Sequence, residues 1–544
     1  MILQTLYQRH CAYTRRLDRN SDAQSPHLEV LSLGAALLVH LASPPPIAWG
    51  STLVQDNLVP RVDSIHQELN YEEKVKTRFA SLPPLPQEFP DLKPTPRPRF
   101  YKTRLASNKM KIILLEDHEV PMVRGFLSMK GGSRMAPQGN PALAALSMSV
   151  QRAGGSTIHP GEEFNAILEN ASSRIEAASG SDALYVGFSC LTDDAETVVG
   201  LVSELVRHPN VSQGTEYTEE MLQLRKVQAM NALEHKNDNA QGIPMREIEK
   251  LICGKDSVYV AEPTKQQIAD TSLSDIGDWI STYENPENTV IGIVGDFKAK
   301  DMEELVKQSF TDWHKGDHRL HVPNPGIPDQ TGIQGNIYVI DRPNLKQSTV
   351  VLAKPGISLG DPDEIELGVF AEIINSFGGS LFDTIRSKQG LAYSVSAGLE
   401  STPIDHKGLF VATAETDKPV ALLQSVFETL EMAAATVPSD EEFTRAQQEA
   451  MNSFVFSIAS LQDQLQRAVV YETFGIPENR LYEYVDKVRG TTPTKVQAAA
   501  ARLLSTPRDS MVTMIIGDAS SILPDLSMTF PDSKIIPYTL SDSS

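Results

Sequence analysis

The sequence is poor in cysteine, with only Cys11, Cys190 and Cys253 among its 544 residues. Three cysteines cannot form a disulfide framework, and none of them stands in the C-x-x-C spacing of a zinc or redox site. We expect Cys190 and Cys253 to be small buried hydrophobic residues. Nothing in the cysteine pattern supports a disulfide-stapled fold.

Positive charge is also scarce. The chain has 49 Lys and Arg against 70 Asp and Glu, a net charge of −21, and no stripe rich in lysine or arginine. Such a surface repels phosphate backbones and cannot release their counterions, so we expect no nucleic-acid partner. The 40% apolar and 22% charged composition is that of a globular protein. At this length, two or more domains follow.

The chain lacks a hydrophobic run of the roughly 20 residues that a membrane span needs. A basic region precedes the apolar residues 30–42, and a proline-containing exit follows. This order predicts a targeting leader over residues 1–50, with membrane contact only through it. A permanent anchor is the second choice, since the run is short and contains His40. The basic region contains the arginines Arg9, Arg15, Arg16 and Arg19.

The leader indicates an exported or organellar protein, with plastid or periplasm favoured over mitochondrion. Acidic residues inside the basic region and the lack of a clean Ala-x-Ala site leave its type open. A bipartite plastid leader would explain its length. A start codon assigned too early, before a plain periplasmic signal, would do so as well.

Proline marks the domain borders. Seven prolines between residues 81 and 100 predict that residues 51–100 form an extended strap rather than a folded element. A second segment rich in turn formers, residues 319–335, is typical of a linker. We therefore expect one domain over residues 101–318 and another over residues 336–544.

The two predicted domains carry the same series of signals, which indicates an internal duplication. Each begins with a strand-like run that ends in lysine and glycine, and each ends with an apolar strand that closes on Gly-Asp. The interval from Lys130 to Lys354 nearly equals the interval from Asp296 to Asp518. Strand patterns alternate with longer helical patterns. The predicted fold class is α+β, with two homologous domains, each a largely antiparallel sheet covered by helices.

The usual hydrolytic motifs are missing. None of the twelve histidines stands in H-E-x-x-H or H-x-x-E-H spacing, the two patterns that place a general base beside a pair of zinc-ligating histidines. The series His314, His318 and His321 runs into the linker and is interpreted as a solvated segment. No G-x-S-x-G elbow and no phosphate-binding loop occur either.

One segment remains, residues 375–395. Its glycines Gly378 and Gly379 predict a turn, after which a helix buries Leu381, Phe382 and Ile385 and ends at Gln389 and Gly390 before a strand over residues 391–398. Arg386 and Tyr393 flank that second turn. By composition alone they are a surface arginine and a strand tyrosine.

This segment resembles the C-terminal-domain signature of the pitrilysin and insulinase zinc peptidases, which include mitochondrial processing peptidase. The resemblance runs from about Tyr101 to the C-terminus and includes the runs at residues 111–121, 132–134 and 285–288. It implies that the two domains form half of a clam-like peptidase chamber, and that Arg386 and Tyr393 bind the substrate carbonyl and the developing oxyanion. A guanidinium fork and a phenolic donor suit that role.

The sequence departs from the family at the zinc helix. Ala145, Met148 and Ser149 stand at the two histidine positions and the base position, and the downstream ligand falls near Asn231, or one turn away at Glu234. Without imidazoles and a carboxylate base, nothing holds zinc or activates its water. We therefore expect neither a metal nor a cofactor site in this chain, and no peptidase activity from it alone.

The resemblance implies a division of labour like that of the family's heterodimers, closest to cyanobacterial and plastid pairs. In this interpretation, a homologous partner subunit holds the zinc, and this chain contributes Arg386 and Tyr393 to the cleavage of peptide substrates. The alternative is an inert scaffold subunit of a larger complex, like the core subunits of cytochrome reductase. A lone active zinc peptidase is the third and least favoured interpretation.

Overall fold

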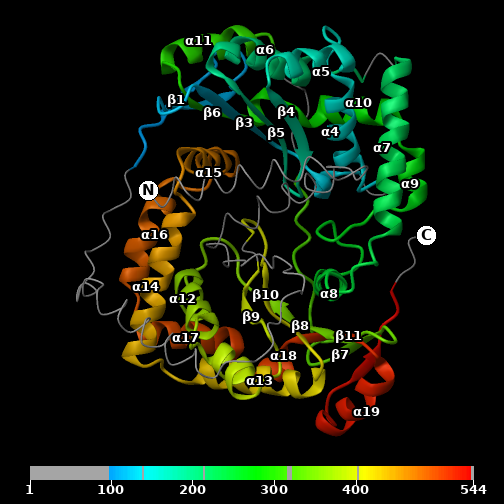
Figure 1. The fold of residues 1–544 in the computed structure, drawn as a ribbon, viewed down its shortest axis with the longest axis vertical. Coiled ribbons are helices and arrows are strands. Elements are labelled where there is room, and N and C mark those ends of the chain that lie inside the picture. Colours follow the sequence, from blue (N-terminus) through cyan, green and yellow to red (C-terminus); the bar gives the residue numbers. More distant parts are fainter. Residues whose placement is uncertain (1–96, 138–139, 212–214, 315–321, 401–402, 541–544) are drawn as a thin grey trace, which may run out of the picture. The chain divides into compact units, whose positions relative to one another are not determined.

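The computed structural model describes residues 97–137, 140–211, 215–314, 322–400 and 403–540 (Figure 1). The predicted leader and nearly all of the proline-rich strap lie outside the described residues, as do Cys11, His318 and His321. Of the predicted linker, residues 322–335 are described and form loops and turns. The domain borders themselves stay predictions.

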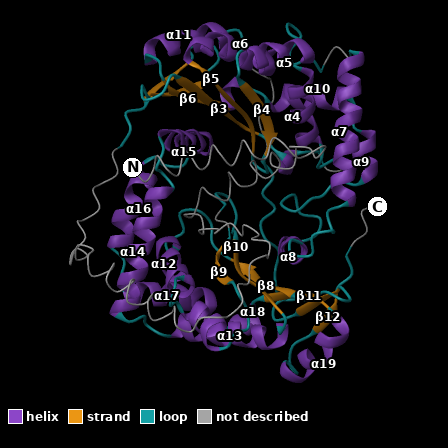
Figure 2. Ribbon diagram, in the orientation of Figure 1, coloured by secondary structure: helices purple, strands orange, loops and turns teal. Residues whose placement is uncertain are grey.

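The described chain forms two mixed six-stranded sheets, one in each half, with helices around them (Figures 1 and 2). Four of the five strand pairings in the first sheet and three of the five in the second are antiparallel. The predicted α+β class with largely antiparallel sheets is confirmed. The strands are β1 Tyr101–Arg104, β2 Lys111–Glu116, β3 Met122–Lys130, β4 Arg174–Ser179, β5 Ala183–Leu191, β6 Thr289–Gly295, β7 Ile337–Asp341, β8 Ser348–Pro355, β9 Val395–Leu399, β10 Leu409–Thr416, β11 Val512–Gly517 and β12 Ile535–Pro537.

Both sheets repeat one strand order. The first is β1-β2-β6-β3-β5-β4 and the second is β12-β7-β11-β8-β10-β9. In each sheet the pair that joins the first and last long strands of the half, β2 with β6 and β7 with β11, is parallel. Only the outer edge strand differs, because β1 precedes its sheet in sequence whereas β12 follows its own. The repeated order is what the predicted duplication requires.

Helices cover both faces of each sheet because the central strands, such as β2, β6 and β11, bury side chains on both faces. In β2, Ile112 and Leu114 join the core beneath α4, α6 and α11, whereas Ile113 and Leu115 face the opposite way. The helices are α4 Leu143–Gly154, α5 Gly161–Asn170, α6 Ala195–Arg207, α7 Glu216–Glu234, α8 Ile243–Cys253, α9 Lys265–Asp270, α10 Leu273–Tyr283, α11 Ala299–Phe310, α12 Glu364–Asn375, α13 Pro419–Ala435, α14 Asp440–Phe456, α15 Leu461–Phe474, α16 Asn479–Arg489, α17 Pro493–Leu504, α18 Pro507–Ser510 and α19 Ala519–Thr529; the short η2 Ser133–Met135, η3 Thr192–Asp194 and η4 Pro286–Asn288 are 3₁₀-helices, and η5 Phe382–Lys388 is a π-helix.

The second face of each sheet is covered by a helix from the other half. Leu465 and Val469 of α15 pack on β2, β3 and β6 of the first sheet. Ile248 and Ile252 of α8 pack on β8 and β11 of the second. Each half therefore contributes one helix that covers a face of the other half's sheet. Without the other half, each sheet would have one uncovered apolar face.

A polar network also joins the halves. Arg134 of η2 donates two hydrogen bonds to Asp405, at 3.1 and 2.7 Å, and pairs with Asp182 at 2.8 Å. The ring of Tyr259 stacks on that of His406 with centroids 3.9 Å apart. The side-chain amide of Asn324 donates to the carbonyl of Asp405. The linker is thus attached to the same network as the two halves.

Among the described residues, no single helix is both long and apolar enough to cross a membrane. The consecutive helices α13 and α14 pass the same test only as a pair, and they are bent by 100° at their junction. Leu422, Val426 and Leu430 of α13 lie in the core beside the second sheet.

Candidate functional site

The segment that carries Arg386 begins with a tight turn at the end of α12. Gly378 has φ of +87°, a left-handed conformation that favours glycine. A Cβ atom on Gly379 would lie 2.7 Å from the carbonyl oxygens of Ile373 and Ile374. Both glycines of the predicted turn are therefore needed to bring the chain back against α12.

The predicted helix follows, but it is a π-helix rather than an α-helix. Residues Phe382–Lys388 form a π-helix, and the amide of Gln389 donates to the carbonyl of Thr384 at 3.2 Å. Leu381 and Ile385 are fully buried as predicted, whereas Phe382 is only half-buried. π-Helical turns are rare and occur often at functional sites. This winding cannot be deduced from apolar spacing.

After Gly390, residues 391–394 form no regular element, and Tyr393 lies at a bend before the chain pairs with the sheet. The prediction of a strand over residues 391–398 is wrong at its start, because β9 begins at Val395. Leu391 and Ala392 are buried instead against the helix layer, so the residues before β9 serve as packing rather than as a ladder. Tyr393 projects from this lead-in and is 79% exposed.

Asn375 attaches α12 to the start of this sheet edge. Its side-chain amide donates to the carbonyl of Ala397 at 2.7 Å, and its side-chain oxygen accepts from the backbone amide of the same residue at 2.9 Å. β9 is the edge strand, so these bonds occupy backbone groups on the side that no other strand of the sheet pairs. The loop that contains Arg386 and Tyr393 is therefore held at both ends.

Arg386 and Tyr393 meet at the surface. The guanidinium carbon of Arg386 lies 4.3 Å from the centroid of the Tyr393 ring and 5.0 Å from that of Phe382. The Phe382 ring lies 4.8 Å from Phe377, which is 85% exposed. Lys388 pairs with Asp383 at 2.6 Å instead of competing for this stack. The result is a row of three rings, of which Phe377 and Tyr393 are exposed and Phe382 is half-buried, that orients one guanidinium.

This arrangement presents donors to solvent. A guanidinium stacked on a ring keeps its in-plane N–H groups free for a carbonyl or carboxylate oxygen. The phenol of Tyr393 offers a further donor beside it. The pair can therefore bind an oxyanion or a peptide carbonyl, whereas neither side chain is a nucleophile or a base at neutral pH.

The residues at the degenerate zinc positions lie on α4, which packs against α7. Ala145 is exposed, and the hydroxyl of Ser149 donates to the carbonyl of Leu146 at 3.0 Å. Met148 is 1% exposed and belongs to the core of the first sheet. The Met148 thioether is therefore packed in the core, on the helix where the family resemblance places the zinc ligands and the general base.

The downstream position likewise has no metal-binding chemistry. Asn231 is exposed on α7, and Glu234, one turn on, pairs with Lys265 at 2.7 Å. Throughout the part of the chain that the structure describes, no group of three or more His, Cys, Asp or Glu side chains is placed to hold a metal ion. The residues on α4 and α7 thus do not fit zinc.

The sequence patterns gave no sign of Glu284, a buried acid next to α4. Glu284 is 5% exposed and accepts a hydrogen bond of 2.7 Å from Gln151, which is fully buried. Burial raises the pKa of Glu284 to about 8, although the bond from Gln151 lowers it. One oxygen of each side chain has no partner in the described structure. A protonated Glu284 supplies the donor that such a pair needs.

The two cysteines in the described chain are both free. Cys190 is 2% exposed in the core of the first sheet, as predicted. Cys253 ends α8 and is only half-buried, so the prediction for it was too strong. Burial raises the pKa of the Cys190 thiol to about 12 and that of Cys253 to about 11. Neither has the low pKa of a reactive thiol.

Comparison with known proteins matches this geometry to one family. Residues 270–450 match the family described as "Peptidase M16 inactive domain". A comparison with curated protein sequences gave no match.

Solved structures share the fold over most of the chain. The peptidase M16 inactive domain from Pseudomonas fluorescens aligns with a TM-score of 0.67 at 21% identity, covering 81% of this chain and 100% of that one. The periplasmic protease PqqL from Escherichia coli aligns at 0.64 and 16% identity, over 82% of this chain and 50% of PqqL. A chain of complex III2 from Candida albicans aligns at 0.62 and 13% identity, over 79% and 99% respectively.

These findings confirm the resemblance to the pitrilysin and insulinase peptidases. The chain has an M16-like fold, and its matched segment is of the inactive-domain type. That segment includes η5 and the Arg386 and Tyr393 pair, but not α4. On α4, outside the matched segment, Ala145, Met148 and Ser149 stand at the positions where the resemblance places the zinc ligands and the base, and none of them is a zinc ligand.

Proposed function

We propose that the chain is the non-metal subunit of a heterodimeric zinc peptidase and that it provides Arg386 and Tyr393 to a shared active site. The observation that carries the proposal is a contrast between two sites. The Arg386 and Tyr393 pair is stacked and open to solvent, whereas Met148 on the zinc helix is a buried apolar side chain. Donors that are oriented and open to solvent are what the binding of a peptide carbonyl requires.

In the proposed reaction, this chain binds and polarises the peptide. Arg386 donates to the carbonyl oxygen of the substrate, and Tyr393 donates to the same oxygen as negative charge develops on it. Donors that are oriented before the reaction stabilise the oxyanion more than the ground-state carbonyl. The zinc on the homologous partner subunit supplies the activated water. Proton transfer also falls to that subunit, because Ala145, Met148 and Ser149 include no carboxylate that could act as a base.

The test is peptide cleavage by the reconstituted pair. Co-purify the chain with a zinc-bearing homologous subunit and measure kcat/KM on an internally quenched peptide. Loss of one oxyanion donor lowers kcat by roughly 10²- to 10³-fold, and we expect effects of this size from Arg386→Ala and Tyr393→Phe. Lys388→Ala is the matched control, since Lys388 lies on the same π-helix and its partner in the described chain is Asp383. Unchanged kcat/KM in Arg386→Ala and Tyr393→Phe would refute the proposal.

A scaffold role is the second candidate, and the similarity to a chain of complex III2 favours it. A scaffold would associate with its partner without any peptide cleavage by the complex. The same reconstitution distinguishes the two functions. Stable association with no peptide hydrolysis, and with assembly independent of Arg386, would support the scaffold.

For the cellular location we propose export, to a plastid or a periplasm. The basic and apolar order of residues 1–50 supports it, and PqqL is described as periplasmic. Mass spectrometry of the mature N-terminus tests this proposal. A mature chain that still begins at Met1 would contradict it.

A further inference from the structure

A cavity of about 410 Å³ lies along α13, and residues of α12, α17 and η5 contribute its other walls. One stripe of α13 lines it, because residues three or four apart share a face of a helix. The stripe consists of Ser425, Glu428, Thr429, Met432, Ala433 and Thr436. It is about 16 Å long at the rise of an α-helix. The lining includes neither Arg386 nor Tyr393, so the peptidase proposal does not use this cavity.

Two serine hydroxyls of the lining have no hydrogen-bond partner in the described structure. Ser425 is 5% exposed, and Ser380, just before η5, is half-buried. The Oγ atoms of both are buried and unpartnered. Buried polar atoms are nearly always hydrogen-bonded, so each exception needs a reason. Since rotation about χ1 can turn a serine hydroxyl toward the cavity, a ligand there would supply the missing bonds.

The charge of the lining is negative. It contains two carboxylates, Glu428 and Glu442, and no Lys, Arg or His. Glu442 is already used as a cap of α14, where it accepts from the amide and the hydroxyl of Ser439 at 2.9 and 2.6 Å. Glu428 is exposed, and its partner in the described chain is the side-chain amide of Gln424 at 2.8 Å. The carboxylate of Glu428 therefore favours a positively charged ligand and disfavours an anion.

Apolar side chains come from three of the walls. Phe370 and Ile373 belong to α12, Met432 to α13 and Val496 to α17. The side-chain amide of Gln497 donates to the carbonyl of Ala434 at 3.1 Å, which holds α17 against α13. Mostly apolar walls with a few polar groups, at a volume of this order, are typical of small-molecule sites.

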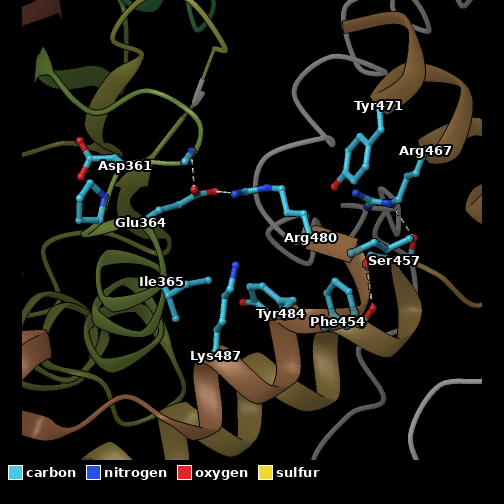
Figure 3. A pocket seen from close by; sticks show the side chains of 13 residues that line it. Asp361, Glu364, Ile365, Phe454, Ser457, Arg467, Tyr471, Arg480, Tyr484 and Lys487 are labelled. Carbon is cyan, nitrogen blue, oxygen red and sulfur yellow. Dashed lines mark hydrogen bonds and ion pairs between the residues drawn. The ribbon is translucent and has the colours of Figure 1, made fainter. Parts of the chain in front are cut away.

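Another cavity, of about 260 Å³, lies where α12, α14, α15 and α16 meet, and its polar groups are already paired (Figure 3). Glu364 forms an ion pair with Arg480 and accepts from the amide of Gly360 at 2.9 Å. Arg467 donates to the carbonyl of Ser457 at 3.1 Å. Within the described chain, no lining side chain of this cavity has a buried polar atom without a partner. The unpartnered serine hydroxyls therefore distinguish the cavity along α13.

We infer that the cavity along α13 binds a small linear amine, with its ammonium group between Glu428 and Ser425 and its hydrocarbon chain against Ile373 and Met432. Residues three apart on a helix have Cβ atoms about 5 to 6 Å apart, so one ammonium group can donate to both side chains. The stripe is longer than a lysine side chain, which favours a free amine over a side chain of another protein. This site is independent of the peptidase proposal and needs no partner subunit.

Isothermal titration of the full chain at low ionic strength tests the inference, with n-butylamine, n-hexylamine and n-octylamine as probes. We expect one equivalent of octylamine to bind saturably, and the affinity to rise about fourfold with each added methylene group. Octan-1-ol should bind more weakly because it has no charge, and octanoate should not bind. An affinity that does not rise with chain length, or octanoate binding as tight as that of octylamine, would overturn the inference. Tighter binding of Nα-acetyllysine amide than of hexylamine would assign the site to a protein side chain and would also overturn it.

Two variants and one control test the position of the ammonium group. Glu428→Gln should weaken octylamine binding roughly fivefold, the upper range for an exposed ion pair. Glu431→Gln is the matched control, because Glu431 is exposed on the same helix and does not line the cavity. Ser425→Ala removes a hydroxyl that has no partner, so it should weaken binding without lowering the thermal unfolding temperature.

The Glu428 variant should keep its fold, since Glu428 is exposed. The comparison of Glu428→Gln with Glu431→Gln is therefore decisive even if Ser425→Ala is unstable. No saturable binding of octylamine by the unaltered chain, or equal binding by the Glu428 and Glu431 variants, would overturn the inference.

Discussion

The guanidinium of Arg134 and the carboxylate of Asp405 form a two-pronged hydrogen bond between residues 271 positions apart in the chain. The arginine is 5% exposed and the aspartate 30%. Burial raises the pKa of Asp405, but the bonds from Arg134 and His406 outweigh it and hold that pKa below its ordinary value. The pair therefore stabilises the contact between the halves whenever Asp405 is ionised.

The first prediction concerns this pair. Arg134→Gln should lower the free energy of unfolding by roughly 2 kcal/mol, because it leaves Asp182 and Asp405 without their shared cation. Asp405→Asn should lower the free energy of unfolding by less, because Arg134 keeps its ion pair with Asp182. The contribution is present above the ordinary pKa of aspartate, 3.8, and is lost as pH falls through the lower folded-state value.

Chemical denaturation of both variants, at neutral pH and again in acid, measures this effect. Arg174→Gln serves as control, because Arg174 is exposed on β4 and its loss should change stability by less than about 0.5 kcal/mol. Equal stability of the Arg134 and Arg174 variants would show that the contact between the halves does not depend on this ion pair.

The second prediction uses two glycines of the first sheet. A Cβ atom on Gly292 would lie 2.3 Å from Cγ2 of Val469 on α15, whereas one on Gly187 would meet nothing within 4 Å. Gly292→Ala should therefore push α15 from the sheet and cost about 1 to 3 kcal/mol. Gly187→Ala should be nearly neutral. A comparison of their thermal unfolding temperatures decides whether the exchanged helix packs as tightly as described.

The third prediction is a pH dependence set by Glu284. Its pKa rises from 4.5 in the unfolded chain to about 8 in the folded one. Between these values the unfolded state releases the proton first, so stability decreases as pH rises, by up to about 1.4 kcal/mol per pH unit. Glu284→Gln keeps the shape and removes the proton, and should flatten this part of the profile. Parallel profiles for the two proteins would contradict the assignment.

The fourth prediction separates function from folding in the Arg386 segment. Tyr393 is 79% exposed and Arg386 is also exposed, so Tyr393→Phe and Arg386→Ala should change stability by less than about 0.5 kcal/mol. Ile385→Ala, the neighbour of Arg386 and fully buried, should cost about 2 to 5 kcal/mol. Far-UV circular dichroism and thermal melts check both. Destabilised surface variants would mean that a fall in activity could reflect misfolding.

Local signals predicted the repeated elements well. The strands that end at Lys130 and Pro355, and those before Asp296 and Asp518, lie where their apolar runs place them. The reason is that strands with two buried faces must be continuous apolar runs, and such runs are visible in one dimension.

What depends on distant contacts could not be predicted. Nothing in the sequence around Leu465 says that α15 covers a sheet formed by strands from the first half of the chain. The late start of β9 reflects packing of Leu391 and Ala392 against helices, which outweighs their strand pattern. The cavity around Arg467 draws on four helices, and no single segment carries its signal. The roles of Arg386 and Tyr393 remain predictions from the family resemblance.

The exchange of α8 and α15 between the two halves bears on how a duplicated chain can bury both faces of its sheets. A half-length chain with one sheet and one such helix would leave the inner face of its sheet bare, and would bury it only against a second copy. Two copies that trade one helix each form a two-fold swapped dimer. Tandem fusion makes that pairing intramolecular and independent of concentration. In the present chain each half covers one sheet face of the other, so we expect neither half to fold when it is expressed alone.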